Sequence, residues 1–367
     1  MLKNIRKNKK KKNESSIIGR LRGWFYHGRF IGFDIQSIIM TVLTALTIIT
    51  TVIMGLLLYN RFKMAIKQTA VTNTENMVEN TVEKLDADLL NVRQITNAVN
   101  YNIIQEYDIS SRDFNRQFSL LYEINADKIQ SMALYDDKGN LLTAEPVTVQ
   151  KDAVEPSEQD WYQDAEADIE NIHFSIPHIQ NLFVDGTYRY YWVVSLSRSV
   201  DINDGEQPGS GVLLVDMKYS VIEDTLARIN DASNGIYYYL CSRNGQMIYH
   251  PRGTDMDRGY FKEEYRDAAT YEDGTYELTV NGRTSNVIVN SVAYTGWKVV
   301  GVVPESVQIA SINRFRYYII TTVIILMMML LGVNRIISKK ISRPILKLNE
   351  SVKAYEAGGP TDIYIGG

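Results

Sequence analysis

Two long runs of uncharged, apolar residues stand out in the pattern of the chain. They are residues 37–59 (SIIMTVLTALTIITTVIMGLLLY) and residues 317–334 (YYIITTVIILMMMLLGVN). A helix of about 20 apolar residues crosses the hydrocarbon core of a bilayer, so the pattern predicts transmembrane helices at residues 37–59 and 317–335. The first run is long for a signal peptide and lacks a small-residue cleavage site, so we interpret it as an anchor.

A second pattern follows the first run, because residues 61–107 contain neither Pro nor Gly. Apolar residues recur there at alternating intervals of four and three, which predicts one long helix packed along one face. The residues in this pattern are Val78, Val82, Leu85, Leu89, Val92, Thr96, Val99 and Ile103. Two interpretations fit the pattern, since the helix either lies on its own domain or forms the seam of a homodimer, and both can hold for different parts.

Beyond residue 107 the pattern changes to short strands separated by turns. Residues 128–144 (KIQSMALYDDKGNLLTA) and residues 235–251 (GIYYYLCSRNGQMIYHP) each predict strand, tight turn, strand. Each is followed by two more predicted strands, at 188–200 and 209–219 in the first case and at 283–294 and 296–305 in the second. The pattern therefore predicts two related modules joined by a short helix at residues 219–230.

The segment after the second apolar run has its own helical pattern (KKISRPILKLNESVKAYEAGG, residues 339–359). Apolar residues at intervals of four and three predict an a/d seam on a new helix, with a proline in its first turn and a Gly-Gly-Pro stop. This signalling seam comprises Ile341, Pro344, Ile345, Leu348, Val352 and Tyr355. The alternative is an amphipathic helix on the membrane surface, but its polar face mixes acidic and basic residues.

Charge orients the two predicted spans. Basic residues outnumber acidic ones in residues 1–36 and again after residue 335, so the positive-inside rule predicts that both termini are cytoplasmic. The segment 60–316 is then extracellular. It is acidic, because both ends of the chain are basic and the whole chain still has a formal net charge of −4. An acidic domain disfavours nucleic acid as a partner. The basic N-terminal tail is interpreted as a topology signal next to anionic lipid.

The long helix, the two hairpins (YDDKGNLL and RNGQMIYHP) and the passage GSGVLLVDMKYSVIEDTL resemble the double Cache sensor family. The resemblance covers most of residues 61–316. It implies an α+β fold with two PAS-like antiparallel sheet modules on the long N-terminal helix, a distal module at 108–230 and a proximal module at 231–305.

The ISRPI start of residues 336–367 resembles the first helix and connector of a HAMP domain. A double Cache domain followed by HAMP resembles the N-terminal half of YesM-type sensor histidine kinases. The resemblance implies a receptor in the bacterial plasma membrane that acts as a homodimer and signals to a response regulator through a kinase domain not contained in these residues. The alternative is a chemoreceptor or a cyclic-dinucleotide signalling receptor with the same sensor.

In the amino-acid-binding branch of the double Cache family, an Arg two positions before a Trp-Tyr pair and a later Asp hold the ligand. Trp161, Tyr162 and Asp216 match that pattern, but Gln159 occupies the Arg position. Without the bidentate Arg fork, the sequence favours a sugar or another small polar molecule over an α-amino acid. Arg189 and Tyr191, or else their neighbours Tyr190 and Trp192, are predicted to line the same site because alternate strand residues share a face.

The remaining chemistry gives no sign of an enzyme in these residues. No G-x-S-x-G, H-E-x-x-H or Gly-rich phosphate loop is present, so no catalytic residue and no cofactor is predicted. His173 and His178 lack the ligand spacing of a zinc site. We expect the SIPHI segment (residues 175–179), which contains His178, to fix a loop. The single cysteine, Cys241, excludes an intrachain disulfide.

Overall fold

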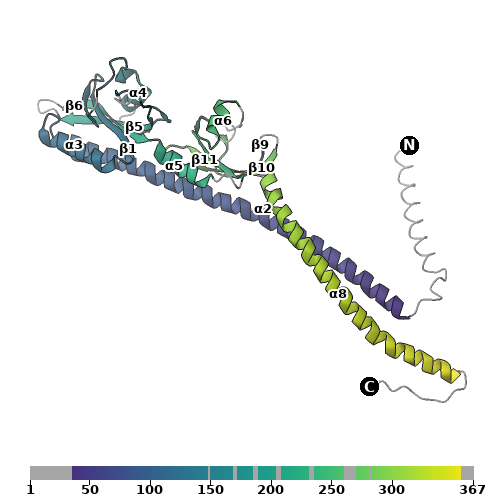
Figure 1. Ribbon diagram of the computed structural model, residues 1–367. Coiled ribbons are helices and arrows are strands. Elements are labelled where there is room, and N and C mark those ends of the chain that lie inside the picture. Colours follow the sequence, from purple (N-terminus) through teal and green to yellow (C-terminus); the bar gives the residue numbers. More distant parts are fainter. Residues whose placement is uncertain are drawn as a thin grey trace, which may run out of the picture. The chain divides into compact units, whose positions relative to one another are not determined.

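The computed structural model describes residues 35–147, 149–167, 172–184, 189–203, 208–230, 235–259, 270–280 and 283–356. The chain divides into two compact units, which are described separately (Figure 1). We call residues 64–312 the sensor unit, and the flanking residues on both sides of it the helical unit. Residues 1–34 of the predicted tail and the predicted connector at 357–367 lie outside the described residues.

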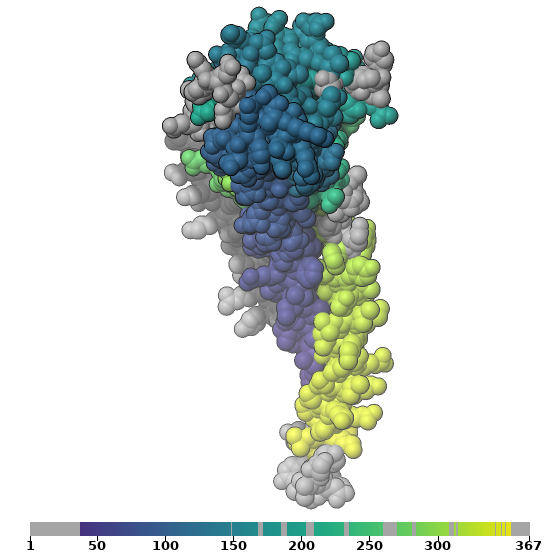
Figure 2. Space-filling model, turned by 90° about the vertical axis from the view of Figure 1, so that its left-hand side faces the viewer, coloured from purple at the N-terminus to yellow at the C-terminus, as the bar shows by residue number. Residues whose placement is uncertain are grey.

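The first module of the sensor unit is built on an antiparallel sheet with the strand order β2-β1-β6-β5-β3, in which β4 also pairs with β5. Its strands are β1 (Ile129–Asp136), β2 (Leu141–Glu145), β3 (His173–Phe174), β4 (His178–Ile179), β5 (Trp192–Asn203) and β6 (Pro208–Lys218). Its helices are α3 (Arg112–Asn125), η2 (Pro156–Glu158), α4 (Asp160–Ala167) and α5 (Ser220–Ile229). Figure 2 looks onto this end of the unit, where the blue surface of α3 lies below the teal surface of the strands that follow it.

The second module repeats the arrangement with the strand order β8-β7-β11-β10-β9. Its elements are β7 (Tyr237–Cys241), β8 (Met247–Tyr249), α6 (Gly253–Asp257), β9 (Gly274–Val280), β10 (Arg283–Ser291) and β11 (Lys298–Pro304). In the two strand orders, the β7–β8 hairpin takes the place of β1–β2, and the β10–β11 hairpin takes the place of β5–β6. The repetition predicted from the sequence is therefore confirmed, and β9 is a strand that the sequence analysis missed.

The predicted turns depend on two glycines. Gly139 and Gly245 have φ angles of 81° and 77°, which lie in the left-handed region that glycine adopts without steric cost. These residues close the β1–β2 and β7–β8 hairpins. The second pair of strands in each module is also confirmed, although β5 begins at Trp192 rather than at residue 188.

The long helix α2 (Ile35–Val99) continues into a short π-helix, η1 (Asn100–Ile104). Within the sensor unit, one face of α2 lies under both sheets (Figure 1). The residues of the predicted seam are Val78, Val82, Leu85, Leu89, Val92, Thr96, Val99 and Ile103, and each is at most 7% exposed. Because the sheets of the same chain already cover this face, the interpretation of these residues as a homodimer seam is wrong.

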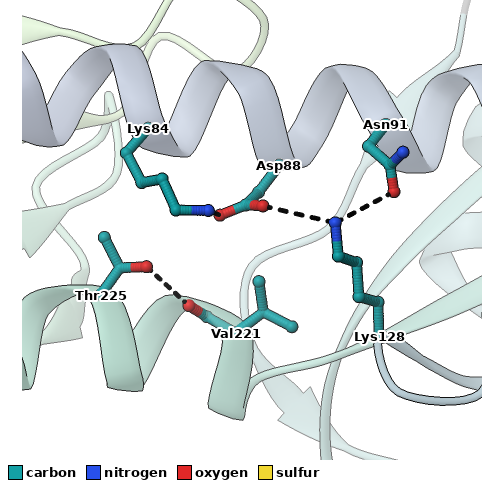
Figure 3. Close-up of polar contacts among 6 residues, drawn as sticks. All are labelled: Lys84, Asp88, Asn91, Lys128, Val221 and Thr225. Atoms are coloured by element: carbon teal, nitrogen blue, oxygen red, sulfur yellow. Dashed lines mark hydrogen bonds and ion pairs between the residues drawn. The ribbon is translucent and has the colours of Figure 1, made fainter.

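A buried carboxylate also holds α2 against the first module (Figure 3). Asp88 accepts a hydrogen bond from Lys84 at 2.7 Å, one turn earlier in the helix. Its other oxygen lies 3.7 Å from the ammonium of Lys128, which also contacts Asn91 at 3.4 Å. Since Lys128 immediately precedes β1, this network fixes where the sheet begins relative to the helix.

The helical unit contains the N-terminal part of α2 and most of α8 (Glu305–Glu356). Each of these helices contains an 18-residue window of high mean hydropathy, 2.3 in α2 and 2.1 in α8, and is long enough to cross a membrane. Between them, the Asn334 side chain donates hydrogen bonds to the Thr47 hydroxyl at 3.0 Å and to the Leu43 carbonyl at 3.4 Å. A polar contact of this kind fixes the register of two helices in an apolar environment.

The expected new helix after residue 338 is not a separate element. Pro344 lies inside α8, which is continuous from Glu305 to Glu356. The prediction that Pro344 occupies a first helical turn is therefore wrong. A proline inside a helix removes one backbone hydrogen bond without breaking the helix when the neighbouring turns persist.

Candidate functional site

The two faces of the first sheet differ in chemistry. The face toward α2 is apolar, whereas the opposite face combines an aromatic cluster with polar side chains. On β6, Val212 and Leu214 point to the aromatic cluster, so by strand alternation Asp216 lies on that same face. We call this surface, opposite α2, the polar face of the first module.

Asp216 lies at the centre of the polar face and is 1% exposed. In the sheet it stands directly between Ser131 on β1 and Ser195 on β5. Both serine hydroxyls donate hydrogen bonds to it, at 2.7 Å from Ser131 and 2.5 Å from Ser195. The pairing of the strands thus supplies the partners that a buried carboxylate needs.

The burial of Asp216 raises the pKa of its carboxyl group, while the hydrogen bonds from Ser195 and Ser131 and the nearby His178 lower it. The net direction is upward because removal from water penalises the charged form. The two serines therefore do not fully replace water. A cationic group placed beside Asp216 would stabilise its ionised form.

Three further polar atoms on this face are buried and lack a hydrogen-bond partner within the described part of the chain. They are the hydroxyl groups of Tyr135 and Ser197 and the Nε2 atom of His173. His173 is paired with Ser197 across β3 and β5, and the pKa of Tyr135 is raised by burial and, to a smaller extent, by the charge of the nearby Asp216. Buried polar atoms without partners indicate groups that a ligand can satisfy.

His178 joins this face from the short strand β4. Its Nδ1 atom lies 3.1 Å from the Ile176 carbonyl and 3.3 Å from the Ser175 hydroxyl, while its Nε2 atom lies 3.3 Å from Ser195. The imidazole therefore connects the SIPHI turn to the serine that holds Asp216. This arrangement agrees with the predicted role of the segment in fixing a loop.

Aromatic side chains cover the other part of the polar face. Trp161 and Tyr162, on α4, are buried with Tyr135, and the Trp161 and Tyr135 rings lie 5.5 Å apart. The Tyr162 hydroxyl donates to the Asp136 carbonyl at 2.8 Å, which fixes α4 on the end of β1. The structure therefore brings Trp161, Tyr162 and Asp216 to one face, with Tyr135 between them.

The other predicted ligand residues lie elsewhere. The Gln159 side chain donates to the Glu155 carbonyl at 3.3 Å, and its backbone carbonyl accepts the first hydrogen bonds of α4. Arg189 is exposed, and Tyr191 lines a cavity together with both Tyr190 and Trp192. Tyr188, which the strand prediction included, lies outside the described residues.

The sequence analysis missed the residues that surround Asp216. Ser131, Tyr135, Ser195 and Ser197 reach it only through the pairing of β6 with β5, which precedes it in the chain, and with the distant β1. The available signal was strand alternation within residues 128–144, which places Ser131 and Tyr135 on one face. No local signal showed which strand would be their neighbour.

Within its described residues, the second module carries an apolar side chain at the position equivalent to Asp216. Val302 lies two residues before the end of β11, as Asp216 lies two residues before the end of β6. Around Val302 the corresponding cluster consists of Tyr239, Cys241, Val287, Val289 and Val300. Only the first module therefore carries a buried carboxylate in this position.

Metal binding is not indicated for the described residues. No group of three or more His, Cys, Asp or Glu side chains within the described ranges could hold a metal ion. The arrangement around Asp216 instead offers hydrogen-bond acceptors, hydroxyl groups and aromatic walls. These groups suit a small organic molecule with a polar, donor-bearing end.

Comparison with known families and curated proteins gives consistent matches. A model of the Cache domain family matches residues 62–312. A probable methyl-accepting chemotaxis protein of Bacillus thuringiensis subsp. konkukian is 20% identical over 301 residues, covering 79% of this chain and 42% of the relative. Methyl-accepting chemotaxis protein TlpB of Bacillus subtilis is 23% identical over 231 residues, covering 62% of this chain and 30% of the relative. The chain spans less than half the length of these relatives.

Solved structures share the fold. The ligand-binding domain of the Campylobacter jejuni chemoreceptor Tlp3, in complex with 4-methylisoleucine, matches with a TM-score of 0.51 and 11% identity, covering 66% of this chain and 94% of that chain. The ligand-binding domain of Mlp24 with asparagine matches with a TM-score of 0.50 and 14% identity, covering 68% of this chain and 98% of that chain. At this identity the likeness concerns the fold alone.

Proposed function

This chain belongs to the Cache domain family, and we propose that it is the sensing part of a bacterial chemoreceptor that binds a small amine at Asp216. A membrane receptor fits the two candidate membrane helices that flank the sensor unit. The observation that carries the ligand proposal is a buried carboxylate surrounded by polar atoms without partners.

A chemoreceptor output is favoured over a histidine kinase. The curated relatives are named as methyl-accepting chemotaxis proteins, whereas the kinase expected from the sequence finds no support among them. A chimera tests this choice directly. Residues 1–356 of this chain would replace the corresponding part of TlpB in a Bacillus subtilis strain without other receptors, and amine-directed swimming would be measured. A gene that encodes a kinase domain after residue 367 would contradict the chemoreceptor.

The ligand proposal rests on the chemistry around Asp216. A primary ammonium group donates three hydrogen bonds and carries a positive charge, so it satisfies a buried carboxylate better than a neutral sugar does. The Mlp24 and Tlp3 structures of the same fold are complexes with asparagine and 4-methylisoleucine, which disfavours the sugar expected from the sequence. Because Gln159 cannot form the bidentate contact of an arginine, we propose that the amine rather than a carboxylate determines recognition.

Calorimetry on the full chain in lipid nanodiscs tests the ligand proposal. A panel of primary amines, amino acids and sugars would be titrated into wild type and Asp216→Asn. We expect at least one amine to bind and the substitution to weaken it by about 100-fold, since a charge-assisted contact contributes about 1.5–3 kcal/mol. Asp201→Asn, an exposed position on β5, is the matched control. Sugar binding unaffected by Asp216→Asn would contradict the proposal.

The end of α8 is proposed to be the first helix of a HAMP-like output. Ile341, Ile345, Leu348 and Val352 of the signalling seam are 40–57% exposed, which leaves an apolar stripe open to a partner helix. The side chain of Tyr355 lies outside the described residues. In the chimera, Ile345→Asp with Leu348→Asp should abolish the response while leaving amine affinity unchanged. An unchanged response would contradict the role of the seam.

A further inference from the structure

A concave site lies between the two modules of the sensor unit. The cavity has a volume of about 840 Å³ and is open to solvent. The start of β5, the junction between β6 and α5, strand β8 and helix α6 all line it, so both modules contribute. It is separate from the polar face, because its lining contains neither Asp216 nor the serines that hold it. We call it the intermodule groove.

Five Tyr and Trp side chains line the intermodule groove. Tyr190, Tyr191 and Trp192 come from the chain entering β5, Tyr219 follows β6, and Tyr249 ends β8. Tyr190 is 80% exposed and Trp192 is 51% exposed. Large aromatic groups left open to water at a concave surface indicate a binding site rather than a core.

The groove has a fixed shape because hydrogen bonds hold its walls. The Tyr219 amide donates to the Trp192 carbonyl at 3.0 Å, and the two rings lie 6.3 Å apart at 51°. The Tyr219 hydroxyl donates to the Ile248 carbonyl of the second module at 2.8 Å. This one side chain therefore connects both walls, so the site is formed before a ligand binds.

The charge of the groove is negative. Glu223 and Asp257 line it, and neither forms an ion pair with a residue that the structure describes. Lys218 also lines it, with its ammonium donating to the Ala126 carbonyl at 2.5 Å, so the two carboxylates leave an excess of one negative charge. Burial raises the pKa of Tyr219, and the charge of Glu223 raises it further, so the phenol stays neutral at physiological pH.

We propose that the intermodule groove binds a quaternary ammonium compound. The faces of aromatic rings attract a cation through their quadrupole, and two carboxylates beside them complement its charge. A quaternary nitrogen has no N–H group, so it needs ring faces rather than hydrogen-bond acceptors. The polar face around Asp216 instead offers hydrogen-bond acceptors, since its buried carboxylate oxygens require a donor. The two sites therefore differ in the type of amine they bind.

Titration of choline into the full chain in nanodiscs tests this proposal. Choline should bind, and its uncharged carbon isostere, 3,3-dimethylbutan-1-ol, should bind about tenfold more weakly or not at all. Trp192→Ala should weaken choline binding by about tenfold, and Glu223→Gln with Asp257→Asn should weaken it several-fold and reduce its dependence on salt. Asp216→Asn should leave choline binding unchanged.

Other variants separate loss of the site from loss of the fold. Tyr190→Leu changes a ring that is 80% exposed, so it should keep the fold and still weaken choline binding several-fold. Tyr294→Ala removes an exposed aromatic outside the groove and should have no effect. Equal binding of choline and its isostere, or loss of choline binding in Asp216→Asn with retention in Tyr190→Leu, would overturn the proposal.

Discussion

At the scale of single residues, Asp216 determines the chemistry of the polar face. It is buried, its two hydrogen-bond partners are neutral hydroxyls, and burial raises its pKa more than these bonds and the nearby His178 lower it. A carboxyl group in such a place is stabilised in its protonated form. This makes the stability of the ligand-free protein depend on pH.

The sign of this dependence follows from linkage. Burial raises the folded-state pKa of Asp216 above the ordinary value of 3.8, so the folded state binds a proton that the unfolded state has lost. Its stabilising contribution is complete below pH 3.8 and disappears as pH rises through the folded-state pKa. Each unit of upward shift corresponds to about 1.4 kcal/mol.

We therefore expect the melting temperature of wild type relative to Asp216→Asn to decrease from about pH 4 upward and then to become constant. Thermal unfolding of both proteins between pH 4 and pH 8 measures this difference. Asp201→Asn serves again as the exposed control and should show little change. A difference that increases with pH would show that the carboxyl group is stabilised in its ionised form.

Asp216 was predicted as a ligand residue because it matches the Asp of the amino-acid-binding branch, and this match required no knowledge of the sheet. Ser131 and Ser195 could not be predicted as its partners. They lie 85 and 21 positions away in the sequence, and serine is common in strands and loops alike. Only the pairing of β6 between β1 and β5 makes them neighbours.

At the scale of elements, the contact between α2 and the second sheet requires a glycine. A Cβ atom at Gly301 on β11 would lie 2.6 Å from the Thr74 methyl group and 2.9 Å from Val78 on α2. Real side chains do not approach so closely. The helix therefore lies directly on the backbone of this strand.

Gly301→Ala should destabilise the sensor unit by about 1–3 kcal/mol, because the added methyl group forces α2 away from β11. Adding Thr74→Ser removes the methyl group that clashes while keeping the hydroxyl that donates to the Ala70 carbonyl, so the double variant should recover part of the loss. Denaturant unfolding measures both. Gly209→Ala, where no heavy atom lies within 4 Å, should have little effect. Equal stability of all variants would contradict the close contact.

The sequence predicted the apolar stripe of α2 correctly but not its partner. A stripe with intervals of four and three suits another helix and a sheet equally well. The choice depends on the sheets, which bury Val78 and Leu89 in the same core as residues of β1 and β11. The partner of the apolar stripe of α8 around Ile345 is likewise not determined by its spacing, so its packing against another helix stays a prediction.

At the scale of the whole molecule, the distribution of basic residues predicts how the chain crosses the membrane. Fluorescent-protein and alkaline-phosphatase fusions after residue 356 should give fluorescence and no phosphatase activity if this end is cytoplasmic, because the phosphatase is active only outside. A phosphatase fusion after residue 312 should be active. The opposite pattern would place the sensor unit inside the cell and contradict the receptor.

The output could not be predicted from the described residues, because the same sensor fold precedes different signalling domains. The double Cache fold follows from two repeated hairpins and a long helix, all of which are visible as patterns in the chain. Kinase and chemoreceptor differ in residues beyond that fold. The relatives, rather than any physical feature of the sensor unit, favour the chemoreceptor.

Cys241, the only cysteine of the chain, lies buried at the end of β7. Burial raises the pKa of its thiol to about 11, so it has little thiolate at neutral pH and should be slow to react with maleimides. A new cysteine on the surface would then be the only fast-reacting site. Spin labels or fluorophores can therefore be attached to chosen positions of the native sequence, and the distance between the two modules can be followed as ligand is added.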